Sequence, residues 1–487
     1  MTGGPADELV EGGYALEIAD APLLHRGLTL ADLAHVLTLL HAGVIPPEPA
    51  RALLGVLLEA LEVAPEDFPY DPAYGEVYSS RERHFADRIG TAAGWLHAGR
   101  TRREAMRIAF RLQLRSVLTD LIAAAAGLVA DLARLAASHT ETWMPDQTYL
   151  QHAQPTTFGH YVLSFAHPVL RDGHRLTAEL DGVDASPGGT GSGNGTALLP
   201  DRTPVADRLG FDSVIDHTRD AMWQTDGLVA ALAAGASLLV TQSTLAEDLE
   251  IYASQEYGWV SLGDGYSRSS VLLPQKRNPY ALTMIRGAAG VAIGRLTGML
   301  AVTKTPSARS DNLIFAYGEV PRALAAAART TRLTAGVVRT LSVDAGRLWT
   351  ALEGGVAQAG DLAEYVMLHC GVDYRSAHRV VGVAVRAALD RGLRGVDLDP
   401  DALDAAAVEV LGHPLGLDAA QLRHALDPRE IVHSRTCRGG AAPEEVARMA
   451  AGCVSEGSSL ADAARARARR HRIAEQALVA AAREVTC

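Results

Sequence analysis

Apolar residues recur at helical spacing through several long stretches that contain no proline. Between residues 104 and 137 they fall at Met106, Phe110, Leu114 and Leu118. A spacing of four residues places such side chains on one face of a helix, and at about 1.5 Å per residue this helix approaches 50 Å in length. Similar stretches cover residues 219–254, 279–303 and 321–341. The pattern predicts long helices that bury several faces against one another.

The long stretches are flanked by two regions of a different kind. Residues 1–103 mix short helical patterns with Pro and Gly breaks, and beyond about residue 360 the sequence returns to short helical patterns separated by Gly and Pro. Because Pro and Gly interrupt long helices, we expect smaller helical domains at both ends. The predicted domains are residues 1–103, a central long-helix domain at 104–360, and residues 361–487.

The composition favours an all-α protein with a large core. Hydrophobic residues make up 48% of the 487 residues, but aromatic residues only 5%. The alternating runs of β-branched residues that are typical of strands are scarce. We therefore expect an all-α fold.

Charge and cysteine usage narrow the class of partner. A net charge of -12 argues against nucleic acid, because phosphate binding depends on accumulated Lys and Arg. The four cysteines lack the spacing of a metal site or a disulfide framework. The N-terminus lacks a signal-peptide pattern and we find no apolar run approaching 18 residues, so we expect a cytoplasmic protein without a membrane span.

Two segments stand out locally. A glycine-rich segment at residues 188–195 is expected to form a flexible loop that can approach a ligand closely, although it lacks the Lys-Ser/Thr pair of a phosphate-binding loop. Near the C-terminus several arginines crowd together, and we expect them to form a solvated helix face. They are Arg465, Arg467, Arg469, Arg470 and Arg472.

The segment SSVLLPQKRNP at residues 269–279 carries the most specific chemistry. Its Lys276 and Asn278 are two residues apart, and an ammonium and an amide so placed can bind one carboxylate. The segment resembles the GSSxMPxKxNP loop of the fumarase/aspartase superfamily.

Four further segments resemble argininosuccinate lyase in particular. They are LHAGRTR from Leu96, MPDQTYLQHAQP from Met144, AEDL to EYG from Ala246, and GGAAPEEV from Gly439. Their order and approximate spacing agree with that family from about residue 75 to 450, which covers most of the chain.

This resemblance implies an architecture and a reaction. In the family, the long central helices of four subunits form a twenty-helix bundle, and each active site takes residues from three subunits. Its members eliminate fumarate from a succinyl adduct without a metal or an organic cofactor. A base removes the proton next to a carboxylate, and an acid assists the departing amine.

The resemblance also implies which residues bind the dicarboxylate. Lys276 matches the family's carboxylate-binding lysine, and we assign it to the catalytic group as well. The further positions that match polar substrate-binding residues are Thr101, Arg102, Thr148, Gln151 and Asn278.

The sequence departs from the family at its proton-transferring positions. The catalytic Ser falls on Val271, with Ser270 beside it, and the family's His falls on Tyr149. The Glu that orients that His falls on Thr283, and a substrate-facing Asn becomes Arg103. We take Ser270 and Tyr149 as the candidate acid and base, and Arg103 as a substrate-binding residue. These changes argue against argininosuccinate as the substrate.

Three functions remain open. The first is a carbon–nitrogen lyase of specialised metabolism that releases fumarate or a related unsaturated acid from another N-substituted aspartate. The second is a non-catalytic or structural paralogue that still binds dicarboxylates. The third is a cycloisomerase acting on a polycarboxylate. In each case we expect a homotetramer with a small-molecule ligand, and the amine half of a substrate is not specified by the sequence.

Overall fold

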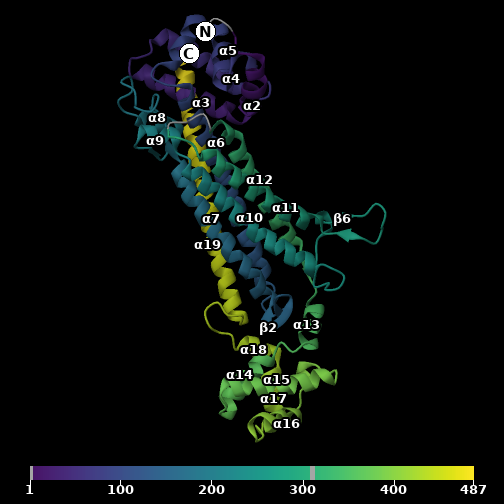
Figure 1. The fold of residues 1–487 in the computed structure, drawn as a ribbon. Coiled ribbons are helices and arrows are strands. Elements are labelled where there is room, and N and C mark those ends of the chain that lie inside the picture. The colour runs from purple at the N-terminus through teal and green to yellow at the C-terminus, as the bar shows by residue number, and fades with distance from the viewer. Residues whose placement is uncertain (1–3, 308–312) are drawn as a thin grey trace.

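Long helices form the central bundle of the computed structural model, which describes residues 4–307 and 313–487 (Figure 1). At its centre, α6 packs against α7, α12 and α19, and against α3 (Ala21–His41) of the N-terminal region. The all-α class expected from the sequence is confirmed. The helices of the bundle are α6 (Arg102–Ala137), α7 (Phe158–Val183), α10 (Asp226–Tyr252), α11 (Tyr280–Thr303), α12 (Ile314–Thr340) and α19 (Pro443–Thr486).

Shorter helices lie at both ends of the bundle (Figure 1). The C-terminal group has a hydrophobic cluster of its own between residues 362 and 426, whereas the N-terminal group shares the core of the bundle. At the N-terminal end lie α1 (Asp7–Leu9), α2 (Ala15–Ala19), α3, α4 (Pro47–Glu62) and α5 (Val77–Ile89). At the other end lie α13 (Ala345–Gly354), α14 (Ala359–Cys370), α15 (Tyr374–Asp390), α16 (Pro400–Leu411), α17 (Ala419–Leu426) and α18 (Pro428–His433).

The last helix, α19, corrects the expectation of short helices beyond residue 360. It contains 44 residues and runs back along α6 and α7 toward the N-terminal end (Figure 1). Glycines interrupt its pattern, but a Cβ at Gly457 would lie 3.2 Å from Val129 of α6. The close packing of the two helices therefore outweighs the low helix propensity of glycine at this position.

The stretch at residues 219–254 also differs from the prediction of one helix. It divides into α9 (Thr218–Trp223) and α10, with a break at Gln224 and Thr225. At the break, the Gln224 side chain accepts a hydrogen bond from Arg111 of α6. Hydrophobic periodicity along the sequence cannot predict this tertiary contact.

Short strands occur in the connections between helices. The register places β1 antiparallel to β2, β3 parallel to β4, β5 antiparallel to β8 and β6 antiparallel to β7. The β6–β7 hairpin stands away from the bundle (Figure 1). The strands are β1 (Trp143–Thr148), β2 (Gln151–Thr157), β3 (Ala185–Ser186), β4 (Ser213–Val214), β5 (Val260–Ser261), β6 (Arg268–Ser269), β7 (Arg277–Asn278) and β8 (Ser342–Val343).

Four helices are more apolar than the sequence analysis allowed. By length and composition alone, α3, α6, α10 and α11 are each sufficient to cross a membrane, and residues 227–246 of α10 contain no charged side chain. The most apolar windows of α3 and α6 are 83% and 72% buried within the molecule. The corresponding window of α11 is only 17% buried, so an apolar surface of this helix faces outward.

A ladder of arginines follows one face of α6. Arg111 donates hydrogen bonds to the carbonyls of Gly182 (3.0 Å) and Val183 (3.1 Å) at the end of α7. Arg115 donates to the carbonyl of Leu209 (2.8 Å) at the end of α8 (Thr203–Leu209). A guanidinium supplies donors to carbonyls that a helix end leaves unpaired. The ladder consists of residues four apart, namely Arg103, Arg107, Arg111 and Arg115.

A buried carboxylate joins the N-terminal region to the start of α6. Asp32 of α3 is fully buried and accepts hydrogen bonds from Arg81 of α5 (3.2 Å), Arg100 (2.5 Å) and the Tyr78 hydroxyl (2.8 Å). Arg100 also donates to the carbonyl of Ala31 (3.2 Å). Two arginines thus compensate one carboxylate away from water, which fixes the turn that leads into α6.

The glycine-rich loop at residues 188–195 is held in place rather than flexible, contrary to the expectation from its composition. Residues 188–191 are buried, and the amide of Gly189 donates to Oε1 of Glu104 at 2.6 Å. A Cβ at Gly191 would lie 2.6 Å from the carbonyl oxygen of Gly195. Glycine is therefore required here for close backbone packing, and the loop is fixed against the first turn of α6.

Glu104 is itself an unusual carboxylate. It is 1% exposed, and its Oε2 has no hydrogen-bond partner among the described residues. Burial raises the pKa of Glu104 to about 7, although Arg100 and the amide of Gly189 favour the ionised form. Within the fold, this carboxyl therefore changes its charge near neutral pH.

Substitution of Asp32 tests the buried cluster. Asp32→Ala leaves two buried guanidinium groups without their carboxylate, so we expect a loss of about 3–5 kcal/mol in the free energy of unfolding. Urea denaturation followed by circular dichroism at fixed protein concentration measures it. Asp87→Ala removes the exposed partner of Arg83 and should cost at most about 1 kcal/mol. Equal effects of the two substitutions would contradict the role of Asp32.

Glu104 predicts a pH dependence of stability. Its folded pKa of about 7 exceeds the ordinary value of 4.5, so the folded state binds more protons between these values and stability falls as pH rises through this range. Glu104→Gln keeps the acceptor for Gly189 and has no charge. We expect the variant to gain up to about 3 kcal/mol relative to wild type between pH 5 and 8. Parallel pH-stability curves in urea would exclude this assignment, and the exposed Glu59→Gln is the control.

Candidate functional site

The first group of predicted site residues lies at the start of α6. Thr101 is the N-cap: its Oγ1 accepts a hydrogen bond from the amide of Glu104 and donates one to the carbonyl of Gly191 at 3.0 Å. Because the cap holds the helix start and the glycine-rich loop together, Thr101 places both on one small surface.

The neighbouring arginines are held by acidic side chains. Arg102 donates to Glu76 at 3.1 Å and to the Ser79 hydroxyl, yet its side chain remains 52% exposed. Arg103 donates to Glu17 of α2 at 2.9 Å and is 21% exposed. Arg102 therefore exposes a larger fraction of its side chain to a ligand than Arg103 does.

The second group lies at the tip of the β1–β2 hairpin. Thr148 pairs in register with Gln151, so Tyr149 and Leu150 form a two-residue turn with φ values of 55° and 59°. Such a turn requires the left-handed region at both positions, which costs about 1–2 kcal/mol for each residue other than glycine. The Tyr149 side chain is 99% exposed, and those of Thr148 and Gln151 are also exposed.

The third group lies on the β6–β7 hairpin. Oγ of Ser270 accepts hydrogen bonds from the amides of Leu272 (3.3 Å) and Leu273 (3.0 Å), which forms a tight turn at the tip. Val271 is fully exposed. The position that the sequence resemblance aligns with the family's catalytic Ser therefore presents an apolar side chain to solvent, while the Ser270 oxygen caps the turn.

Lys276 and Asn278 lie on the returning side of the same hairpin. The Asn278 amide donates to the carbonyl of Arg268 at 3.2 Å, so one of its donors stabilises the hairpin. The Lys276 side chain is exposed and makes no hydrogen bond or ion pair with any residue that the structure describes. Its ammonium is thus available to an anion.

The three groups do not meet within one chain. Thr101 lies at the start of α6, and the β1–β2 hairpin follows the end of this helix of 36 residues, which is about 54 Å long. The β6–β7 hairpin projects from the side of the bundle (Figure 1). The structure therefore brings together the members of each group, but it separates the groups.

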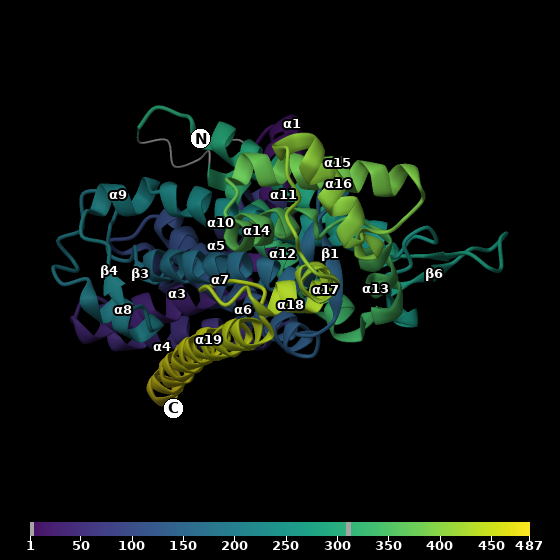
Figure 2. The same ribbon diagram turned by 90° about the horizontal axis from the view of Figure 1, so that it is seen from below.

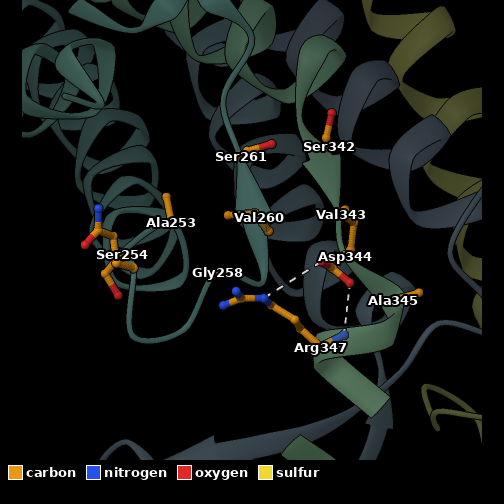
Figure 3. A pocket seen from close by; sticks show the side chains of 11 residues that line it. Ala253, Ser254, Gly258, Val260, Ser261, Ser342, Val343, Asp344, Ala345 and Arg347 are labelled. Carbon is orange, nitrogen blue, oxygen red and sulfur yellow. Dashed lines mark hydrogen bonds and ion pairs between the residues drawn. The ribbon is translucent and has the colours of Figure 1, made fainter. Parts of the chain in front are cut away.

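A hollow of about 740 Å³ lies outside all three groups, beside the end of α10 and the β5–β8 pair (Figure 3). Arg347 reaches across it and donates to the carbonyl of Tyr257 at 3.2 Å. A Cβ at Gly258, whose φ is +59°, would lie 2.3 Å from the Arg347 guanidinium. The positive φ favours glycine at position 258. None of the predicted site residues lines the hollow.

Two residues that position the site were missed by the sequence analysis. Glu104 anchors the glycine-rich loop, and Glu76 holds Arg102 while it caps α5. The Thr-x-x-Glu spacing of residues 101–104 is the sequence signature of a helix N-terminus and was the available signal for Glu104. Within residues 4–307 and 313–487, no group of three His, Cys, Asp or Glu is placed to hold a metal ion.

Comparison with known proteins identifies the family of this chain. Residues 31–294 match the family model described as lyase, and residues 356–433 match the model of the argininosuccinate lyase C-terminal region. The argininosuccinate lyase of Methanoculleus marisnigri is 34% identical over 87% of this chain and 85% of its own length. That of a Mycobacterium species is 36% identical over 86% of this chain and 88% of its own length.

Among solved structures, EDDS lyase has the same fold. A variant of it with bound fumarate, and the enzyme in complex with formate, each superpose with a TM-score of 0.88 at 25% identity. Each comparison covers 100% of this chain and 97% of the other. By its sequence relatives and its fold, this chain belongs to the argininosuccinate lyase-like members of the fumarase/aspartase superfamily.

Proposed function

We propose that this protein is a carbon–nitrogen lyase that eliminates fumarate, or a related unsaturated acid, from an N-substituted aspartate other than argininosuccinate. Its relatives named argininosuccinate lyase and the fumarate complex of EDDS lyase support the reaction class. The substitutions at Val271 and Tyr149 support a different substrate, since they alter the positions that transfer protons in the family.

Lys276 is the observation that carries the proposal. The sequence contains only two lysines, Lys276 and Lys304, so nearly all of its 45 basic residues are arginine. A lysine on an exposed hairpin that has no partner among the residues the structure describes indicates that the compact charge of an ammonium is needed there. An ammonium stabilises the charge that develops on a carboxylate when the neighbouring carbon loses its proton.

Proton transfer in this proposal falls to Tyr149 and Ser270. Val271 has no group that can accept a proton, whereas Tyr149 presents a phenol hydroxyl at a strained turn. Backbone strain retained beside an exposed reactive group is typical of functional sites. A leaving group that departs without protonation would need only one of the two residues.

The proposal includes a homotetramer with shared active sites. The three residue groups are separated within one chain, so only other copies can bring them together. The outward surface of α11 supplies apolar area for such contacts, and large exposed apolar patches mark interfaces. Side chains about half exposed on this helix are Met284, Val291, Ile293 and Leu300.

Light scattering tests the assembly. We expect a mass of four times the chain mass of 51.4 kDa. Val291→Glu should split the assembly, because it places a charge in the apolar contact. Val408→Glu, at a similarly exposed valine on α16, is the control and should leave the mass unchanged. A stable monomer of the wild-type protein would remove the basis for a shared site.

Incubation with fumarate and a panel of amines tests the chemistry, with mass spectrometry to detect N-substituted aspartates. We expect at least one adduct and negligible cleavage of argininosuccinate. Tyr149→Phe or Ser270→Ala should lower the rate about 10²–10⁴-fold, the usual contribution of a general acid or base. Fumarate binding and assembly should persist in both variants, and Tyr374→Phe and Ser269→Ala are the matched controls.

The same experiment separates the alternatives. Fumarate binding without any adduct would favour a non-catalytic paralogue, and robust argininosuccinate cleavage unaffected by either substitution would show that neither residue is the acid or base. Calorimetry with Lys276→Ala supplies an independent measurement. Loss of one charge-assisted contact is worth roughly 1.5–3 kcal/mol of fumarate binding.

A further inference from the structure

The arginines crowded near the C-terminus divide into two sets on α19. Arg467 and Arg470 turn toward α7 and the following loop, where Arg467 pairs with Asp181 and Arg470 lies 2.6 Å from Asp212. Arg465 and Arg472 lie seven residues apart, which is about two turns, and therefore share a different face of the helix. The cluster therefore does not form one solvated face, in contrast to the prediction, because Arg467 and Arg470 bind acidic side chains of α7 and the following loop.

The face that carries Arg465 and Arg472 borders a cleft of about 500 Å³ between α3, α6 and α19. Arg26 of α3 and Arg115 of α6 line the same cleft, together with His471. Its remaining wall contains the polar side chains of Gln113, Ser116 and Thr119 together with small and apolar residues, among them Gly27, Leu30, Ala109, Leu112, Ala464 and Ala468. The cleft therefore combines a cationic rim with an apolar surface.

The acidic groups of the cleft do not neutralise its rim. Glu475 pairs with Arg26, and Asp120 pairs with Arg332, which lies outside the cleft. Asp184 pairs with Arg115 and Asp462 pairs with Arg465, so Arg472 is the arginine of the cleft that no described carboxylate pairs with. An unpaired arginine in a concave surface attracts anions.

The arginines of the cleft differ in the hydrogen bonds and ion pairs that they make within the chain. Arg115 is fixed by Asp184 (3.3 Å) and by the carbonyls at the end of α8, so it forms a rigid wall. Arg465 pairs with Asp462 at the surface. Arg472 makes no hydrogen bond or ion pair with the residues that the structure describes. Arg472 is therefore the donor most open to a ligand.

The cleft lies away from the surface assigned to subunit contacts. α19 packs against α3, α4, α6, α7 and α8, whereas α11 packs against α10 and α12. Figure 2 shows α19 along one side of the bundle and α11 away from it. None of the predicted site residues lines the cleft.

We propose that this cleft, which we name the α19 cleft, is a binding site for a small organic phosphate, separate from the dicarboxylate site. The phosphate lies between Arg465 and Arg472, whose planar guanidinium groups match phosphate oxygens in pairs. The apolar body of the ligand lies on the small side chains of α3, α6 and α19. Such pockets with few convergent polar groups are typical of ligand sites.

Calorimetry on the assembled protein tests the α19 cleft with ADP as the probe. We expect millimolar or tighter binding that weakens with added salt, and at least about a tenfold loss of affinity in Arg472→Ala and in Arg465→Ala. Arg469→Ala is the matched control, because this exposed arginine of the same helix does not line the cleft, and it should bind ADP as the wild type does. Adenosine should bind far more weakly than ADP.

Three results would overturn the proposal. The first is the absence of ADP binding at millimolar concentration. The second is an equal loss in all three arginine variants, which would show attraction to the net charge of the helix rather than a site. The third is competition between ADP and fumarate, which would place ADP at the dicarboxylate site. Circular dichroism and the mass of the assembly verify that each variant is folded.

Discussion

The buried carboxylate of Asp32 is the interaction on which the arrangement of this protein depends. It ties α3 and α5 to the turn before α6 through two guanidinium groups, one of them Arg100. Because Thr101 follows Arg100 directly, the same cluster fixes the N-cap of α6 and, through it, the glycine-rich loop. The scaffold of the first site group is therefore determined by charge pairing in the N-terminal core.

The long helices were the most predictable part of the fold, because α6 and α10 combine helical periodicity with the absence of proline. The β1–β2 hairpin was not predicted, since Tyr-Leu is not a pair that favours a two-residue turn. The long helix α19 was missed because local glycines conceal a helix that only packing against α6 explains. The glycine-rich loop shows the same limit, as its rigidity comes from Glu104, which is 84 positions before Gly188 in the chain.

The sequence motifs selected the candidate site residues, whose part in binding or proton transfer stays a prediction. The motifs did not predict the geometry of these residues. They gave no indication that Arg103 binds Glu17 or that the Ser270 oxygen caps a turn. Those contacts depend on elements distant in sequence or on the local backbone, and they decide which side chains remain available. Lys276 and Tyr149 remain fully available, which is why the proposed chemistry rests on them.

The arginine ladder of α6 sets the axial spacing of helix ends that pack against this helix. Arg111 and Arg115 each meet the carbonyl end of a different helix, so the axial distance between these ends is set by a fixed number of residues. One residue inserted between the two arginines would turn every later side chain by about 100° around the axis. Arg115 would then leave its carbonyls, and Leu118 would occupy the place of the buried Thr119. Length variation among relatives is therefore expected in the loops around α6, and substitution without insertion or deletion within it.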